Sequence, residues 1–339
     1  MAKKAKYDWG RSTGKYQKFE TRLTFKFDVT SDAQDSVFID TAQCLSAINR
    51  KLIRQGQVFR IKNGKFFARD ADANIISVGV SALPRTWMMY NAYRKARGLW
   101  NQMNLDSISA LGAGNLSKYY DFKVLFDREH FKNHILDTGA TLTSNLLPVD
   151  GSGNAFSGSP ADTGEWDYSY YEDSQASADR FYGHMLGTHS DASGAAEGSS
   201  GRDPPADGGS AGLVLAYQQS RGSSFTDQDI SGLNQNVDAD SPWAMLFGAD
   251  DQSQQVLSAL DDQNDAPPYP AVDYAGAIEH PEGTLVSIGC FNSADYVGRY
   301  IPTFEAPLGL IKLDCNVEGD TNDTSNIWFT FDTEIMGAM

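Results

Sequence analysis

Cysteine and long apolar runs are the scarce features of this chain of 339 residues, which contains three cysteines. Cys44, Cys290 and Cys315 are odd in number and widely spaced in apolar surroundings, so we exclude a disulfide framework and expect reduced, buried thiols in a cell interior. No apolar run reaches the roughly 18 residues of a membrane-spanning helix. The first residues, MAKKAKYDWG, lack the apolar centre of a signal peptide, so we expect neither membrane insertion nor classical secretion.

Basic residues are scarce in the later part of the chain. Residues 135–339 hold 5 Lys and Arg against 32 Asp and Glu, a net of −27, whereas residues 1–134 hold 23 against 12, a net of +11. This asymmetry indicates one face toward a polyanion and another toward solvent. The alternative is that the acidic loops serve solubility and pair with the basic residues.

Alternation of apolar and polar residues is the main structural signal. Residues 19–29 alternate strictly, which predicts a long half-buried strand. Asn63-Gly64 predicts a hairpin within residues 57–69. Further strands are predicted at 74–83, 118–127, 142–149, 284–291, 308–317 and 326–336. The strand at 284–291 is expected to be buried, and residues 212–219 are expected to resume the core in a part of the chain made of strands and loops.

Two helices are expected in the basic part of the chain. Residues 83–104 carry an apolar stripe at helical spacing, with a basic face opposite it. Its members are Met89, Tyr93, Ala96, Trp100 and Met103, and the basic residues are Arg94, Lys95 and Arg97. Asp40 is expected to cap a helix reaching about Gln55, with Cys44, Leu45, Ile48 and Leu52 inward and Arg50, Lys51 and Arg54 near its C-terminal end.

These elements predict an all-β protein, an antiparallel eight-stranded jelly-roll sandwich with long loop insertions and a few short helices, in which the first and last strands pair. The expected domains are an arm at 1–18 and a single jelly-roll domain at 19–336, with surface insertions at about 150–211 and 220–281. Aromatic residues between Trp166 and Tyr182 indicate that the middle of the first insertion is folded. Residues 187–211 have the composition of a flexible linker. The second insertion is expected to hold a short helix near residues 252–260.

The arm combines basic and aromatic residues. Its cations are Lys3, Lys4, Lys6, Arg11, Lys15 and Lys18, with Tyr7, Trp9 and Tyr16 between them. Basic side chains neutralise phosphates while aromatic rings stack on unpaired bases, so the arm is a candidate contact for single-stranded nucleic acid. The alternative is an ordinary polar terminus without a ligand.

Catalytic signatures are few. His130 and His134 have the i, i+4 spacing that places two imidazoles on one helical face, but no zinc-protease order accompanies them. His184 and His189 lie in the first insertion, which is expected to be mobile. No nucleophile elbow, phosphate loop or dinucleotide fingerprint occurs. The sequence therefore predicts neither an enzyme nor a resident cofactor or metal.

Two acidic clusters keep one metal hypothesis open. They are Asp250 with Asp251, and Asp261, Asp262 and Asp265. Hard cations require several carboxylate oxygens, so Ca²⁺ between subunits is one reading, and solvated acidic loops are the other. Two of these carboxylates would also suit a glycosidase, depending on a separation that the sequence does not give.

The arrangement of the chain resembles one family. The segments LPRTWMMYNAYRKARGLW and KYYDFKVLFD, and the closing LGLIKLDCNVEGD with its final strand, are similar to single jelly-roll capsid proteins of small circular Rep-encoding single-stranded DNA viruses, the aquatic group in particular. The resemblance covers nearly the whole chain and rests on the order of its features. It implies an icosahedral shell, a basic N-terminal side facing the genome and long loops on the outside. The arm departs from the arginine-rich arms of that family, because Arg11 is its single arginine.

The resemblance implies a virion protein that assembles with itself inside the host cell, and it leaves open whether this happens in the nucleus. It also implies that the protein binds a single-stranded DNA genome and has no membrane partner. The expected nucleic-acid contacts are the six arm cations with Arg50, Lys51 and Arg54. The alternative is a carbohydrate-binding β-sandwich, a cell-surface adhesin or phage receptor-binding protein, whose aromatic residues at 166–182 stack on sugars. A third hypothesis, an acidic β-sandwich hydrolase, requires a convergent pair of carboxylates.

Overall fold

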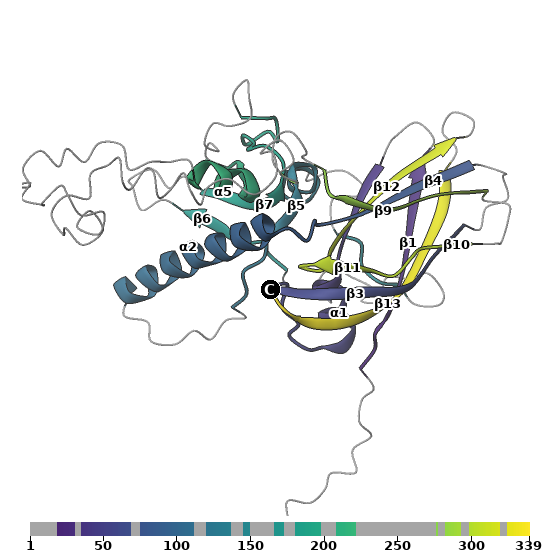
Figure 1. The fold of residues 1–339 in the computed structure, drawn as a ribbon, viewed down its shortest axis with the longest axis horizontal. Coiled ribbons are helices and arrows are strands. Elements are labelled where there is room, and N and C mark those ends of the chain that lie inside the picture. The colour runs from purple at the N-terminus through teal and green to yellow at the C-terminus, as the bar shows by residue number, and fades with distance from the viewer. Residues whose placement is uncertain are drawn as a thin grey trace, which may run out of the picture.

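The structure is a computed structural model, and it describes twelve parts of the chain. These are residues 19–30, 35–68, 75–111, 120–136, 145–149, 166–172, 180–197, 208–221, 276, 282–292, 298–318 and 324–339. Most of the regular secondary structure in the described residues is β-strand, and the two larger sheets are antiparallel. Figure 1 shows these two sheets on one side of the molecule and a smaller layer of strands and helices on the other.

The first large sheet joins the two ends of the described chain. Its order is β1 (Arg22–Thr30), β13 (Thr324–Ala338), β3 (Gln57–Ala68) and β10 (Arg299–Tyr300), and β11 (Phe304–Pro307) also pairs with β3. β1 and β13 are antiparallel, with Phe25 opposite Phe329. The predicted pairing of the first and last strands is therefore confirmed.

The second large sheet has the order β2 (Asp35–Asp40), β12 (Leu310–Glu318), β4 (Ile75–Ala82) and β9 (Thr284–Asn292). The strands predicted at 74–83, 284–291 and 308–317 correspond to β4, β9 and β12. β9 differs from the prediction of a buried strand, because it lies at the sheet edge with Leu285 54% and Ile288 60% exposed. For the same reason Cys290 is exposed, whereas Cys44 and Cys315 are buried as expected.

One apolar core fills the space between the two large sheets. The alternating inward residues of β1 and β13 meet those of β4 and β12 there, and the rings of Phe25, Phe66, Phe329 and Phe331 contact one another. Burial of this size supplies the main driving force for folding of the sandwich.

The described residues between β4 and β9 form a layer packed against the sandwich, which we call the inserted layer (residues 83–283). Its third sheet is mixed, since β7 (Arg180–Leu186) pairs in parallel with β5 (Leu125–Asp127) and β8 (Ser210–Gly212) and antiparallel with β6 (Tyr170–Glu172). Its helices are α2 (Trp87–Leu111), α3 (Arg128–Phe131), the π-helical turn η1 (Lys132–Leu136) and α5 (Leu213–Arg221). A second apolar cluster holds α2 and α5 against Phe122, Phe126 and Leu186.

The helix predicted at 83–104 is confirmed as α2 and is longer than the short helices expected. Met89, Tyr93 and Ala96 are buried, and Trp100 is partly buried. Gly98 does not interrupt the helix, which continues to Leu111. No helix in the described ranges has the length and hydropathy to cross a membrane.

The Asp40-capped helix forms but is shorter than expected. α1 (Thr41–Asn49) begins at Asp40, whose carboxylate accepts from the backbone N–H groups of Ala42 and Gln43. It ends because Arg50 adopts a left-handed conformation, with φ 52°. Leu52 therefore lies outside the helix and is 72% exposed, which contradicts its predicted inward position.

The prediction of a hairpin at Asn63-Gly64 is wrong. β3 runs straight through both residues, and β13 pairs with it on either side of a register shift between Thr330 and Asp332. Asn63 takes φ 53°, a conformation that asparagine tolerates, and donates a hydrogen bond of 2.8 Å to Asp332. The same two residues that favour a tight turn here produce a β-bulge.

Three other predictions fail in the inserted layer. Residues 120–124 belong to no strand, although residues 121–124 are buried, and only Leu125–Asp127 form a strand. Residues 145–148 belong to no strand. Residues 213–221 form the helix α5 in a region expected to hold strands and loops, because Leu213, Val214 and Leu215 pack into the second apolar cluster and its surroundings.

Candidate functional site

An exposed basic patch lies where α1 ends. Arg50, Lys51 and Arg54 are all exposed, and they follow within five residues of Asn49, the last residue of the helix. The sequence predicted these three cations at the end of a longer helix. The early end of α1 instead places them in the connection to β3, where extended backbone spreads them over the surface.

The same place is where the described chain begins. The side chain of Asn49 clamps Glu20, because its oxygen accepts from the Glu20 N–H at 2.8 Å and its amide donates to the Glu20 carbonyl at 2.9 Å. The Lys51 ammonium lies 5.3 Å from the centre of the Phe19 ring. The first described residues, Phe19 and Glu20, therefore lie beside Asn49 and Lys51.

The other six expected contacts, Lys3, Lys4, Lys6, Arg11, Lys15 and Lys18, lie outside the described residues. The structure thus places three of the nine predicted residues. The helix predicted near 252–260 and the acidic residues Asp250, Asp251, Asp261, Asp262 and Asp265 also lie outside them.

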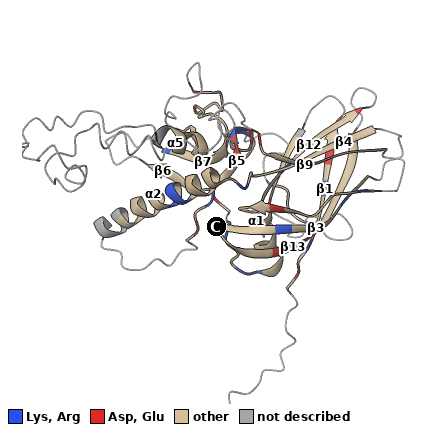
Figure 2. Cartoon of the chain, viewed as in Figure 1, with Lys and Arg blue, Asp and Glu red and all other residues tan. Residues whose placement is uncertain are grey.

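A second basic surface belongs to α2. Arg94, Lys95 and Arg97 are exposed on the side away from its buried stripe, as the sequence predicted, and Figure 2 shows cations on α2 and on β3. Arg97 approaches Gly56, beside the patch at the end of α1, because a Cβ at Gly56 would lie 3.7 Å from its guanidinium. Arg97 of α2 thus lies close to the connection between α1 and β3 that carries Arg50, Lys51 and Arg54.

Asp40 is the centre of a buried polar network between the sandwich and the inserted layer. Besides capping α1, its second oxygen accepts from Gln55 Nε2 and Trp166 Nε1, both at 3.0 Å, and from the Tyr168 hydroxyl at 3.4 Å. Burial raises the pKa of Asp40 to about 6, although these hydrogen bonds oppose the shift. Gln55 continues the network by exchanging hydrogen bonds of 2.7 and 2.9 Å with the backbone of Val124.

His130 occupies the far end of the same network. Its Nδ1 accepts from the Phe126 N–H at 3.0 Å, so the proton must be on Nε2, which donates to Asn145 Oδ1 at 2.7 Å. Asn145 in turn donates to the Tyr168 hydroxyl at 2.7 Å. Burial lowers the pKa of His130 far below its usual value, and the nearby His134 lowers it further. Both ring nitrogens are occupied, so His130 has no nitrogen left for a metal.

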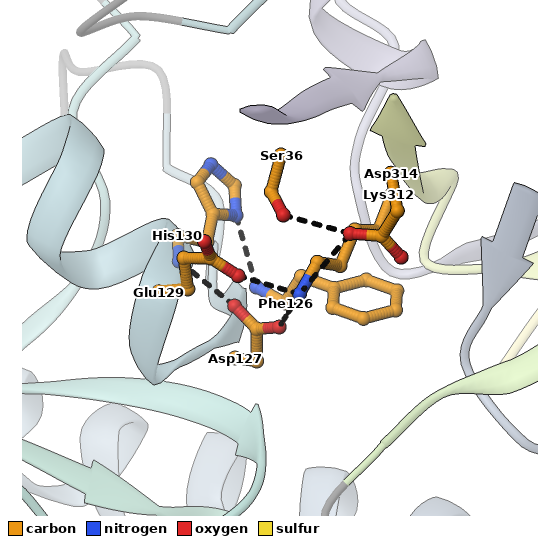
Figure 3. A network of polar contacts seen from close by, with 7 residues as sticks. All are labelled: Ser36, Phe126, Asp127, Glu129, His130, Lys312 and Asp314. Atoms are coloured by element: carbon orange, nitrogen blue, oxygen red, sulfur yellow. Dashed lines mark hydrogen bonds and ion pairs between the residues drawn. The ribbon is translucent and has the colours of Figure 1, made fainter. Parts of the chain in front are cut away.

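Lys312 of β12 joins the second sheet to the inserted layer. Its ammonium lies 3.1 Å from Asp127, 2.6 Å from Glu129 and 3.6 Å from Asp314 (Figure 3). Burial raises the pKa of Asp127 even though Lys312 opposes the shift, and the three carboxylates raise the pKa of Lys312 against the effect of its own burial. A single cation therefore lies among three carboxylates at this contact.

His184 and Ser210 resemble a base and its nucleophile, because Nδ1 and Oγ are 2.7 Å apart. Nε2 faces the Thr188 carbonyl at 3.0 Å, so Nδ1 is the acceptor and Ser210 the donor. Both residues are 0% exposed, which keeps any substrate away. This pair, with Ser190 bound to Ser210 at 2.8 Å, has the geometry of a structural network.

These contacts correct two sequence interpretations. His184 and His189 are buried instead of lying in a mobile loop, and residues 187–197 are held by backbone hydrogen bonds such as Ser190 N–H to Ser210. Burial lowers the pKa of His184 to about 3. Within the described ranges no group of three His, Cys, Asp or Glu side chains is arranged for a metal ion.

The aromatic residues of the first insertion are folded, as predicted. Tyr171 and Phe181 stack at 5.1 Å between ring centres across β6 and β7, and Tyr168 is buried. Tyr170 is 36% exposed and lies under the guanidinium of Arg180 at 4.2 Å. Most of this cluster therefore serves packing, and one ring faces solvent.

Sequence reasoning missed Asp40, Gln55, Lys312 and Asn145 as the residues that join the two bodies. Asp40 was visible only as a helix cap. No local signal could reveal the others, because their contacts across the two bodies are distant in sequence: 69 residues separate Gln55 from Val124, 102 separate Asn145 from Gln43, and 185 separate Lys312 from Asp127. No protein-family model, no curated protein and no solved structure matches this chain.

Proposed function

We propose that the two large sheets form a jelly roll and that the chain is a viral capsid subunit, which assembles with itself into an icosahedral shell around a single-stranded DNA genome. The observation that carries the proposal is the order of the strands. β1, β2, β3 and β4 lie alternately in the two sheets, β9 stays beside β4, and the strands after it alternate again to β13. With β10 and β11 counted as one interrupted strand, this order supports the eight-strand double Greek key of a jelly roll.

The position of the insertion agrees with a shell subunit. The long polypeptide between β4 and β9 leaves the sandwich at one point, so it can vary or project without disturbing the strand order. The described residues hold 19 Lys and Arg against 18 Asp and Glu, so the net charge of −16 stems from the other segments of the chain. A nearly neutral scaffold suits close contact between copies, because like charges do not accumulate on it.

The basic patch supports an inner, genome-facing side. Arg50, Lys51 and Arg54 lie near Phe19 and Glu20, the first described residues, and we propose that the six arm cations act together with them. Such cations bind phosphate without sequence preference, which is what packaging of a whole genome requires. Assembly would take place inside the host cell, and the virion would be the final location. Ca²⁺ between subunits through the acidic clusters belongs to the same proposal, as does an unidentified receptor on the host.

Particle size of the purified full chain tests the proposal. Light scattering across a chromatographic peak should give uniform particles of virus-like size, and the ratio of absorbance at 260 and 280 nm should rise in that peak. Repeating the measurement with Ca²⁺ and with a chelator tests the metal. A monomer in every salt and Ca²⁺ condition would overturn the proposal and favour the carbohydrate-binding alternative.

Packaging should depend on the patch specifically. Replacing Arg50, Lys51 and Arg54, or the six arm cations, with Gln should leave particles of normal size with less nucleic acid, because fewer phosphates are neutralised. The matched control replaces Lys132, Arg180 and Arg299, three exposed cations elsewhere, with Gln. Equal packaging by the patch variant and the control would count against this site.

A further inference from the structure

The edge strand β9 is unusual among the edges of the sandwich. Its nine residues, TLVSIGCFN, contain neither a charge nor a proline. The other edges carry charges: Arg22, Lys26 and Asp28 on β1, Asp35 and Asp40 on β2, and Arg299 on β10. Natural edge strands are protected by charge, proline or cover, since their free N–H and C=O groups otherwise pair with another chain.

The outer side of β9 is also apolar. Leu285 is 54% and Ile288 60% exposed, and the Cys290 thiol is exposed beside them. Within the described ranges β9 pairs with β4 alone, so its other side offers backbone groups without a strand partner. Exposed apolar side chains and a free ladder thus coincide on one strand.

The neighbouring surface is flat enough for close approach. Ser77 and Gly79 of β4 pair with Cys290 and Ile288, and a Cβ on Gly79 would lie 4.0 Å from Leu285 Cδ1 and 3.7 Å from Asp314 Cβ. Leu285 therefore lies on the outer face of the second sheet, next to the small residues of β4. Apart from Ile75 at the start of the strand, no bulky side chain of β4 stands between β9 and a molecule lying against this face.

We propose that β9 is a self-association surface, where two copies of the chain pair their β9 strands antiparallel about a two-fold axis. The two four-stranded sheets would then form one continuous sheet of eight strands, with Leu285 and Ile288 of both copies on its outer face. The role of this pairing as a shell contact rests on the proposed function. The pairing itself is inferred from the exposed apolar residues and the unpaired edge of β9.

A second copy suits β9 better than a different protein because the strand is self-complementary. In a two-fold antiparallel pair each residue faces a residue of the same strand, so any charge near the centre would face its own copy. β9 has none. One strand pair is small for a separate interface, so the contact between two free chains should be weak and should strengthen when other contacts act with it.

The test uses the full chain with Ile288→Lys, which places like charges at the centre of the proposed pair. Sedimentation over a range of concentrations should show association weakened about tenfold or more relative to wild type, equivalent to about 1.4 kcal/mol. Leu105→Lys is the matched control, because Leu105 is 61% exposed on α2 and should keep wild-type association. Circular dichroism establishes that both variants fold.

Hydrogen exchange gives an independent reading. Backbone amides of residues 284–292 should exchange more slowly in associated wild type than in the Ile288→Lys variant. If Ile288→Lys associates as wild type does, the β9 contact is wrong, and particles formed by wild type would still support the shell. If wild type forms a dimer that Ile288→Lys abolishes, and no larger particle, β9 pairing stands and the shell proposal fails. Loss of association in the Leu105→Lys control as well would overturn the assignment to β9.

Discussion

The sandwich and the inserted layer are stabilised in different ways. The core between the two large sheets consists of apolar side chains with two buried cysteines, Cys44 and Cys315. The inserted layer also buries His130, His184 and His189, and it meets the sandwich through the polar contacts of Asp40 and Lys312 as well as through apolar contacts with Phe38, Leu308 and Leu310. Apolar packing tolerates small shifts, whereas a buried polar group loses its partner if the geometry changes.

This difference indicates which part can be disturbed separately. A sandwich whose first and last strands pair is closed by long-range contacts, so loss of its core should unfold the whole chain. The inserted layer leaves and re-enters the sandwich between β4 and β9, and its contacts at Asp40 and Lys312 depend on charge and hydrogen bonding. Changes of charge at these two residues should loosen the layer while the sandwich persists.

The largest effect is expected in the sandwich core. Phe329→Ala removes a ring that is 0% exposed and contacts Phe25, Phe66 and Phe331, so the free energy of unfolding should fall by about 5 kcal/mol. Chemical denaturation measures the loss, with Tyr300→Ala as the control because Tyr300 is 70% exposed. A loss under about 2 kcal/mol would mean that the sheets are not packed through this ring.

A smaller and more local effect is expected at Lys312. Lys312→Met leaves Asp127 buried without its cation, which should cost about 4 kcal/mol at neutral pH. Hydrogen exchange should show faster exchange in β5 and α3 and unchanged protection in β1 and β13. Lys132→Met, at an exposed lysine of η1, is the control. Equal acceleration in both bodies would contradict their independent response.

Patterns within one element were predictable from the sequence. The alternation at 19–29 and 326–336 predicted β1 and β13, and the apolar stripe predicted α2. Signals of two or three residues were not sufficient. Asn63-Gly64 favours a turn, but β3 lies between β13 and β11, so continued pairing outweighs the local preference and leaves a bulge.

The candidate sites divide in the same way. Arg50, Lys51 and Arg54 could be predicted as exposed cations because they cluster in the sequence. Asp40, Gln55 and Asn145 could not be assembled into one network, because chain segments far apart in sequence supply them. The buried state of His184 and His189 was equally hidden, since glycine and serine around them suggest a linker and only the pairing of β7 with β8 encloses them.

The smallest effect is a pH dependence at Asp40, where the two bodies meet. Its pKa is about 6 in the folded chain and 3.8 as an ordinary value, so the folded state holds the proton more tightly and this contribution to stability is lost as pH rises from about 4 to 6. The full change is about 3 kcal/mol.

His130 and His184 act in the opposite direction, because burial lowers the pKa of both and acid favours their unfolded, charged forms. The dependence of wild-type stability on pH therefore sums opposing contributions, and the difference between a variant and wild type isolates the contribution of Asp40.

Asp40→Asn should be less stable than wild type at pH 4.5 and should lose less stability between pH 4.5 and 7, as measured by denaturation at each pH. Ile327→Val, which lowers stability without removing a titrating group, should run parallel to wild type. Parallel profiles for Asp40→Asn and wild type would show that the carboxyl of Asp40 does not titrate in this range, and that its hydrogen bonds outweigh its burial.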